Sequence, residues 1–406
     1  MLRGKHIVVG ISGGIAAYKI PELIRLLRKE GAEVKVTTTK NALEFVTELT
    51  LQTLSGYKVY SDVFAAINEH STEHISLPDW ADAMIIAPAT ANVLGKMANG
   101  IADDALTTTF CAMRKPVVMA PAMNDKMYEC PATQEALRKL SEWSNIILLD
   151  CAAGELACGT TGKGRMQEVP ALAEALRYAL TGKDLASKHV LITSGRTQEA
   201  IDPVRFISNH SSGKQGTALA LSCWRRGAQV DFVCGPSAVY PSVPTFFATA
   251  QQLRNISVTS AAQMAEQTIQ LFPSCDVAIL CAAVADFTPS NVAKEKIKKQ
   301  PGQNEMTLSL TTTTDIAATL GKTKTQNQKL VGFALETCDE QNHALHKLQS
   351  KNLDLIVLNS LQDKGAGFGV DTNKVSLLFA NGTKKDVPLL SKEDIADCIV
   401  EAIRSL

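Results

Sequence analysis

A chain of 406 residues, 45% hydrophobic and 20% charged, exceeds what one hydrophobic core usually organises, so we expect a globular protein of two domains. Its 41 basic and 41 acidic residues cancel, which argues against attraction of the whole surface to nucleic acid or to a membrane. No stretch approaches the ~20 apolar residues that span a bilayer, and the ten cysteines are scattered without a CxxC pair, as expected of a cytoplasmic protein that has neither a disulfide framework nor a zinc site.

The first recognisable pattern is a strand, a glycine turn, a helix and a strand. Residues 5–11 are an apolar run, residues 15–29 carry apolar side chains at helical spacing, and residues 33–39 form the next strand. This order predicts a parallel sheet. The turn, residues 12–14, places backbone N–H groups at a strand end, which favours an anion. It has neither GxGxxG nor GxxxxGK[ST] spacing, so we expect a mononucleotide or flavin phosphate rather than NAD or a P-loop nucleotide.

Three more strands are expected in the first half, over residues 83–87, 116–120 and 146–149. In open α/β sheets, ligands bind beyond the carboxyl ends of the strands. The polar residues expected at these ends, and therefore on one pocket rim, are Ser12, Thr90, Asn92 and Asn124.

Residues 154–166 hold one cysteine, Cys158, among four glycines. Glycines permit tight backbone paths, so this segment is predicted to be a shaped loop rather than a helix or strand. Such a loop could deliver Cys158 onto a bound ligand. From the loop alone, a surface segment with an incidental thiol is the simpler interpretation.

A polar stretch, residues 181–188, interrupts the apolar pattern, and we place a boundary there between domains 1–188 and 189–406. Residues 189–226 then repeat the opening order of strand, glycine-rich turn and helix. Later strands are expected over residues 229–234, 277–282, 330–333 and 353–359, with a hairpin within 375–389 and a final helix over 392–403. A repeated architecture by itself assigns no function.

Short motifs in a fixed order carry a family resemblance. The first half contains SGGIAAYK, PATAN, PAMNDKMY, and ACG followed by GRM; the second contains ITSGRT, IDPVRFISNHSSGKQG, AAVADF, EKIKKQ, VGFALET and KNLDLIVLN. Together they resemble the bifunctional coenzyme A biosynthesis family over nearly the whole chain. Two departures are Thr90, where many relatives have serine, and Arg196, where relatives commonly have proline.

The resemblance implies two Rossmann-like parallel-sheet domains. The first, flavodoxin-like, would be an FMN-dependent phosphopantothenoylcysteine decarboxylase over residues 1–188, and the second a CTP-dependent phosphopantothenate–cysteine ligase over residues 189–406. The ligase would form an acyl-cytidylate of 4′-phosphopantothenate, which cysteine attacks. The decarboxylase would then convert the product to 4′-phosphopantetheine.

The same resemblance implies roles for individual residues. Cys158 would donate a proton, Asn124 would hold the departing carboxylate, and His74 would act in the decarboxylase site. Asn209 would handle the acyl-cytidylate. The positions matched to FMN are Ser12, Gly13, Gly14, Ala89, Thr90 and Asn92. The positions matched to CTP are Ser211, Gly213, Gly216, Leu280, Cys281, Ala282, Asp286, Lys296, Thr314, Asp315, Ile316, Ala317, Phe333, Lys347 and Lys351.

Cofactors and partners follow in the same way. Mg2+ is expected with the triphosphate, although no dedicated carboxylate cage is visible in the sequence. We expect a homo-oligomer in which trimeric decarboxylase units are joined by dimeric ligase contacts, acting on small molecules and not on nucleic acid or membranes. Two alternatives remain: a flavin-binding regulatory subunit without catalysis, and a two-domain nicotinamide dehydrogenase, which the missing GxGxxG opposes.

Overall fold

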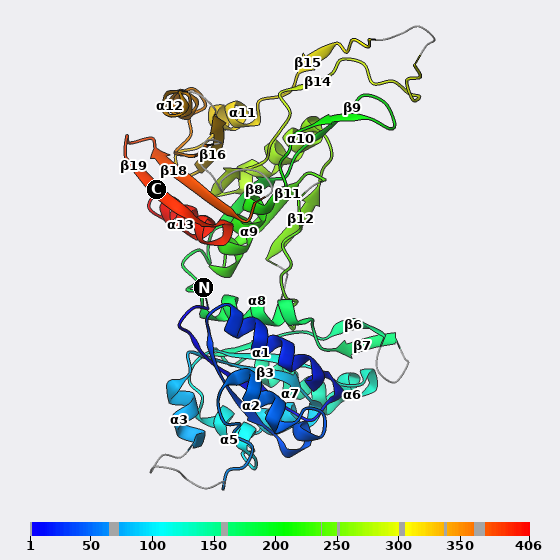
Figure 1. Cartoon of the computed structure of the whole chain (residues 1–406), viewed down its shortest axis with the longest axis vertical. Coiled ribbons are helices and arrows are strands. Elements are labelled where there is room, and N and C mark those ends of the chain that lie inside the picture. Colours follow the sequence, from blue (N-terminus) through cyan, green and yellow to red (C-terminus); the bar gives the residue numbers. More distant parts are fainter. Residues whose placement is uncertain are drawn as a thin grey trace. The chain divides into compact units, whose positions relative to one another are not determined.

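The computed structural model describes residues 2–64, 73–155, 161–236, 238–249, 252–299, 305–336, 339–360 and 370–406. The chain forms two compact units (Figure 1). The first unit consists of Met1–Thr181 together with Ser242–Gln251, and the second of Gly182–Pro241 together with Gln252–Leu406.

Five parallel strands form the sheet of the first unit, in the order β2-β1-β3-β4-β5. They are β1 (His6–Ile11), β2 (Glu33–Thr38), β3 (Ala83–Ala89), β4 (Val117–Pro121) and β5 (Ile146–Leu148). This is the strand order of flavodoxin-like folds and confirms the predicted fold class. Every residue of the central strand β3 is buried, as expected of a parallel strand covered on both faces.

Helices cover both faces of this sheet. Side chains of α1 and α8 share one apolar core with the sheet, and those of α4, α5 and α7 share another. The helices of this unit are α1 (Ile20–Lys29), α2 (Glu48–Ser55), α3 (Glu73–Trp80), α4 (Ala91–Ala98), α5 (Ala105–Ala112), α6 (Asp125–Glu129), α7 (Pro131–Ser141) and α8 (Val169–Leu180), with 3-10 turns over Ile15–Lys19 and Lys40–Glu44.

Two sequence predictions for the first unit need correction. The expected helix over residues 15–29 is a 3-10 turn followed by α1, because Pro21 lacks an N–H and fits only in the first turn of a helix. The segment predicted as a glycine loop contains a strand. Antiparallel strands β6 (Ala152–Glu155) and β7 (Thr161–Arg165) form a hairpin, seen at the edge of the first unit in Figure 1. Its tip, with Cys158, lies outside the described residues.

The segment Ser242–Gln251 belongs to the first unit although it follows the predicted boundary by more than fifty residues. Phe246 forms an antiparallel bridge with Leu149, just after β5. The Asp150 N–H donates to the Thr245 carbonyl at 2.9 Å. This segment therefore extends the edge of the first sheet.

The second unit contains an eight-stranded sheet in the order β12-β11-β8-β13-β16-β17-β18-β19. Its strands are β8 (His189–Ser194), β11 (Gln229–Cys234), β12 (Leu253–Ser257), β13 (Val277–Leu280), β16 (Lys329–Glu336), β17 (Leu355–Ser360), β18 (Thr372–Phe379) and β19 (Lys384–Ser391). The first six in this order are parallel and follow the Rossmann arrangement 3-2-1-4-5-6. The predicted hairpin is confirmed as β18–β19, and it makes the sheet mixed rather than purely parallel.

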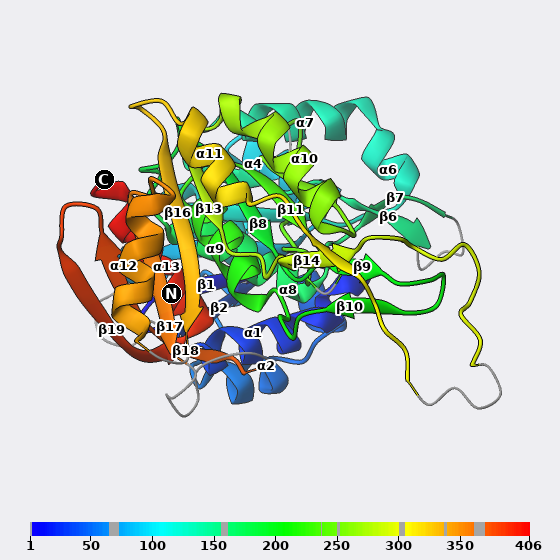
Figure 2. The same cartoon turned by 90° about the horizontal axis from the view of Figure 1, so that it is seen from above.

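Helices α10, α11 and α12 pack against the second sheet through one apolar core, and Figure 2 shows α11 and α12 beside β16 and β17. Helices α9 and α13 pack against each other and against β8, β18 and β19. The helices are α9 (Lys214–Arg225), α10 (Ala261–Leu271), α11 (Ile316–Thr323), α12 (Glu340–Ser350) and α13 (Lys392–Arg404), with a 3-10 turn over Phe272–Ser274. Two short ribbons pair β9 (Gln198–Ala200) with β10 (Phe206–Ser208) and β14 (Phe287–Pro289) with β15 (Leu310–Thr312). In the described ranges, no helix has the length and apolar character needed to cross a membrane.

Candidate functional sites

A cavity of about 1110 Å³ lies in the first unit, beyond the carboxyl ends of β1, β3 and β4. Its wall brings together many of the residues predicted from the sequence. They are Gly13, Gly14, Thr90, Asn92 and Asn124. Of the residues expected on one rim from the strand-end rule, Thr90, Asn92 and Asn124 line this cavity and Ser12 does not.

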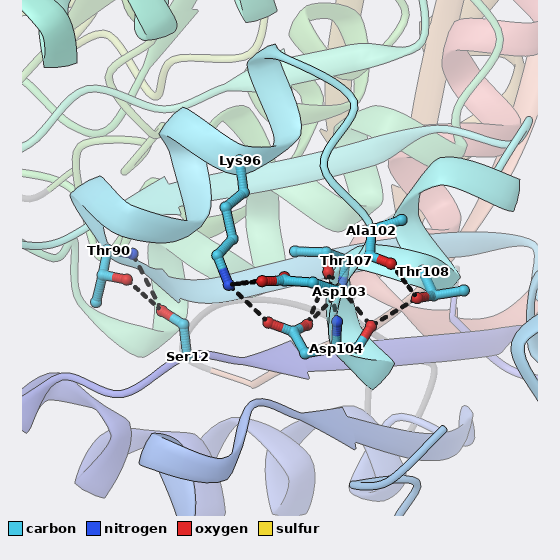
Figure 3. Close-up of polar contacts among 8 residues, drawn as sticks. All are labelled: Ser12, Thr90, Lys96, Ala102, Asp103, Asp104, Thr107 and Thr108. Atoms are coloured by element: carbon cyan, nitrogen blue, oxygen red, sulfur yellow. Dashed lines mark hydrogen bonds and ion pairs between the residues drawn. The ribbon is translucent and has the colours of Figure 1, made fainter. Parts of the chain in front are cut away.

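Ser12 and Thr90 join the glycine turn after β1 to the start of α4. The Ser12 hydroxyl donates to the Pro88 carbonyl at 2.7 Å and accepts the Thr90 N–H at 3.1 Å. The two hydroxyl oxygens are 3.2 Å apart (Figure 3). Ser12 is fully buried, so in this structure it braces the two strand ends, while Thr90 lines the cavity.

The turn has no room for a side chain at Gly13 and little room for one at Gly14. A Cβ at Gly13 would lie 2.4 Å from the Asn41 Cβ, and a Cβ at Gly14 would lie 3.2 Å from the Thr90 Cγ2. Next to this turn, Thr39 lines the cavity with a buried hydroxyl that has no hydrogen-bond partner among the described residues. Buried hydroxyls are normally paired, and a phosphate oxygen would supply the acceptor. The wall thus fits the phosphate end of a flavin mononucleotide.

Thr39 was missed in the sequence analysis. It directly follows β2, the strand beside β1, so the rule that located the other strand-end residues could have found it.

Lys96 and two carboxylates form a charged cluster in the same wall (Figure 3). The Lys96 ammonium lies 2.7 Å from an Asp103 oxygen and 3.5 Å from an Asp104 oxygen. The hydrogen bond with Asp103 raises the pKa of Lys96 and lowers that of Asp103. Asp104 also caps α5, accepting the Thr107 N–H at 2.8 Å. The cluster therefore ties α4 to the start of α5 along the cavity.

Asn124 begins α6, where its Oδ1 accepts the Lys126 N–H at 3.0 Å. The amide oxygen is used in this cap. The other end of the amide, the Nδ2 group, carries the donors that a carboxylate requires. Asn124 itself lines the cavity.

Glycines in β7 let the hairpin lie directly on the loop that carries Asn124. The Met123 N–H donates to the Gly164 carbonyl at 2.9 Å. A Cβ at Gly164 would lie 2.3 Å from the Met123 carbonyl oxygen, and a Cβ at Gly162 would lie 2.8 Å from the Asp125 Cβ. Larger residues at these two positions would push the hairpin away from the cavity.

A second set of contacts holds the hairpin through Asp150. The Lys163 ammonium lies 2.6 Å from one Asp150 oxygen, and the Tyr128 hydroxyl donates to the other at 2.7 Å. Burial and this hydrogen bond raise the pKa of Tyr128, so its hydroxyl stays protonated and continues to donate.

Four predicted residues of the first unit are not placed on the cavity wall: Ser12, whose contacts are given above, His74, Ala89 and Cys158. His74 is partly buried on α3, and Ala89 is buried at the end of β3; neither is among the described residues that line the cavity. Cys158 lies outside the described residues. Their roles stay predictions.

A second cavity, of about 720 Å³, lies in the second unit at the carboxyl ends of β8, β13 and β16. Asn209 and the predicted nucleotide residues other than Lys296 line it: Ser211, Gly213, Gly216, Leu280, Cys281, Ala282, Asp286, Thr314, Asp315, Ile316, Ala317, Phe333, Lys347 and Lys351. Gly216 lets α9 begin directly against β8, because a Cβ there would lie 2.2 Å from the Ser194 Oγ.

Lys351 and Asp315 form an ion pair at 2.9 Å on this wall. Burial alone would raise the pKa of Asp315, but the hydrogen bond from the Ala318 N–H and the Lys351 ammonium together hold it below the usual value. The carboxylate caps α11. The pair therefore fixes Lys351 at the edge of the cavity.

Cys281 adds a thiol to the same wall. Burial raises the pKa of this thiol to about 12. It is therefore protonated at neutral pH and a poor nucleophile.

A hydrogen bond orients the Asn209 side chain, since its Nδ2 donates to the Ala283 carbonyl at 3.0 Å.

Lys296 is exposed and is not among the described residues that line the cavity. Its neighbour Ile297 is anchored, with its N–H donating to Asp202 at 3.1 Å. No group of three or more potential metal ligands of the His, Cys, Asp and Glu types occurs in the described part of the chain.

In comparisons with known proteins, each half of the chain matches a protein family. Residues 1–180 match the flavoprotein family, and residues 185–406 match the DNA/pantothenate metabolism flavoprotein C-terminal domain. The coenzyme A biosynthesis bifunctional protein CoaBC of Bacillus subtilis (strain 168) is 46% identical over 100% of this chain and 98% of its own length. The chain belongs to the coenzyme A biosynthesis bifunctional protein family.

Other relatives fall in the same group. The CoaBC protein of Escherichia coli (strain K12) is 40% identical over 99% of this chain and 97% of its own length. A cysteine/cysteine sulfinic acid decarboxylase from an unknown prokaryotic organism is 46% identical over 89% of this chain and 99% of its own length. Among solved structures, the C-terminal domain of a CoaBC protein is 35% identical over 55% of this chain and 97% of that one, with a TM-score of 0.45. Because the chain belongs to this family, the alternative that it is a two-domain nicotinamide dehydrogenase is ruled out.

Proposed function

We propose that this chain is a bifunctional enzyme of coenzyme A biosynthesis, with the decarboxylase in residues 1–188 and the ligase in residues 189–406. The observation that carries the proposal is the full-length match to the bifunctional family at up to 46% identity. Two separate cavities, each lined by residues matched to one of the two activities, support it.

The first cavity would hold FMN, with the phosphate at the Gly13–Gly14 turn and Thr39. When bound, the flavin supplies reversible two-electron oxidation of the substrate thiol, which makes loss of the carboxylate feasible. Asn124 binds that carboxylate through its Nδ2 donors. A neutral amide holds the carboxylate less strongly than a cation would and so does not impede its departure. Cys158 returns a proton to the carbon that loses CO2; a thiol with an ordinary pKa of about 8.5 is protonated at neutral pH.

The second cavity would hold CTP and 4′-phosphopantothenate. Lys347 and Lys351 supply positive charge to the nucleotide phosphates. The pantothenate carboxylate displaces pyrophosphate from CTP, and the cysteine amine then displaces CMP from the acyl-cytidylate beside Asn209. The protonated Cys281 thiol does not compete with that amine.

Three finer features belong to the same proposal. Mg2+ would accompany the triphosphate, held mainly by phosphate oxygens and water. The chain would assemble as a homo-oligomer, with trimeric decarboxylase units joined by dimeric ligase contacts. It would act in the cytoplasm.

Purified protein tests the two halves separately. A flavin absorption spectrum, and CO2 release from phosphopantothenoylcysteine but not from free cysteine, are expected of the first half. Free cysteine is included because one relative is named as a cysteine decarboxylase. Equilibrium binding of CTP tests the second half. A colourless protein that does not bind added FMN would rule out the decarboxylase.

A further inference from the structure

Arg196 and Asn209 are held against each other beside the second cavity. The Arg196 guanidinium donates from Nη1 to the main-chain carbonyl of Asn209 at 3.2 Å. The Asn209 side chain donates from Nδ2 to the Ala283 carbonyl at 3.0 Å. Arg196 and Ala283 are themselves neighbours, paired in a parallel bridge. Asn209 is therefore held through its main chain by Arg196 and through its side chain by Ala283, and these two residues are neighbours.

The backbone around Arg196 is tightly constrained by its neighbours. Gly195 has a left-handed φ of 80°, and its carbonyl accepts the Ala283 N–H at 2.8 Å. A Cβ at Gly235 would lie 1.9 Å from the Arg196 carbonyl oxygen, so the two main chains are in close contact. A side chain that starts from so constrained a backbone can hold its partner in a defined place.

The residue type at position 196 decides whether this contact exists. A proline at this position would have no side-chain donor. Arginine presents several N–H donors in a rigid fork and stays charged. The arginine at position 196 therefore gives Asn209 a support that a proline there would not give.

We propose that Arg196 is a positioning residue for the ligase reaction, acting through Asn209. The inference rests on the proposed ligase function. Arg196 is not among the described residues that line the cavity, whereas Asn209 is. Loss of Arg196 should therefore slow turnover without weakening the binding of CTP, whose phosphates would contact Lys347 and Lys351 on α12 and just beyond it.

Full-length variants provide the first test. Arg196→Met should lower the ligase kcat between about tenfold and a hundredfold, because small misplacements of a reacting group cost rates of this order. The KM for CTP should stay unchanged. Arg196→Lys, which keeps a charged donor, should recover part of the loss. Arg404→Met, on the exposed end of α13, is the matched control and should keep wild-type kinetics. Wild-type decarboxylase activity in each variant shows that the first unit remains intact.

A double-mutant cycle with Asn209→Ala separates positioning from general destabilisation. The readout is single-turnover release of CMP with enzyme in excess, because CMP leaves in the step that Asn209 would serve. In the Asn209→Ala background, Arg196→Met should lower the single-turnover rate by less than about twofold. A difference of that size is within the range over which the effects of independent changes add. If Arg196→Met lowered the rate equally in the wild-type and Asn209→Ala proteins, or raised the KM for CTP with unchanged kcat, the proposed role of Arg196 would be overturned. If the wild-type protein released no pyrophosphate from CTP, the ligase assignment itself would fail, and this inference with it.

Discussion

The N–H of Met123 donates to the carbonyl of Gly164 at 2.9 Å, and this bond joins the loop that carries Asn124 to β7 of the hairpin. The loop with Asn124, which we propose binds the carboxylate, is thus joined by one backbone contact to the strand that follows Cys158 in the sequence, the residue that we propose returns the proton. The separation of this loop from β7 depends on the absence of a side chain at Gly164.

Gly164→Ala should impair decarboxylation specifically. The new Cβ would lie 2.3 Å from the Met123 carbonyl oxygen, so the hairpin must move. We expect the decarboxylase kcat to fall by about a hundredfold, as for a catalytic group displaced by about 1 Å, with FMN affinity and ligase rate retained. Gly95→Ala is the control, because no atom lies within 4 Å of its added Cβ. Normal decarboxylation by Gly164→Ala would contradict the proposed coupling.

Cys158→Ser should stop the decarboxylase after loss of CO2. Serine is a much weaker acid than cysteine and should not return the proton, so the oxidised intermediate should accumulate. Rapid-quench analysis with mass spectrometry would detect it as a product two hydrogens short. Full turnover to 4′-phosphopantetheine would remove Cys158 from the mechanism.

Lys351→Met should raise the KM for CTP. It removes a charge beside the cavity and the partner of Asp315, whose pKa should then rise. We expect the KM for CTP to increase by about tenfold, the value of one hydrogen bond to a charged group. Lys322→Met, an exposed lysine on α11, is the matched control. An unchanged KM for CTP would remove Lys351 from the nucleotide site.

Cys281 should resist alkylation at pH 8. Because its pKa is about 12, the reactive thiolate is scarce, whereas the exposed Cys130 should react readily. The folded-state pKa exceeds that of an unfolded thiol, about 8.5. The stability that Cys281 contributes is therefore complete below pH ~8.5 and declines as the pH rises toward 12. Iodoacetamide labelling followed by mass spectrometry measures both cysteines together. Equal labelling rates would show that Cys281 is not protected.

Local patterns were sufficient to predict much of the fold and the site. Strands such as β3 are continuous apolar runs because both faces are buried, and the parallel order follows from alternating strands and helices. The carboxyl ends of these strands meet at one edge, so Thr90, Asn92 and Asn124 could be placed together before the structure was known.

Features that depend on distant partners were not predicted. The sequence Thr161–Arg165 has the composition of a loop, but it forms a strand that pairs with β6, and its Gly162 and Gly164 lie against the Asn124 loop. Phe246 joins the first unit through pairing with Leu149, nearly one hundred residues away. The ion pair of Lys96 with Asp103 was missed although the two are only seven residues apart, because it depends on how the chain turns between α4 and α5.

Product stoichiometry in one reaction tests the central claim most directly. The full-length protein would be supplied with FMN, 4′-phosphopantothenate, cysteine, CTP and Mg2+, and pyrophosphate, CO2 and 4′-phosphopantetheine would be measured together. The account predicts equal amounts of all three, with CO2 appearing after pyrophosphate and neither forming without 4′-phosphopantothenate. Release of CO2 without pyrophosphate, or release of neither, would contradict it.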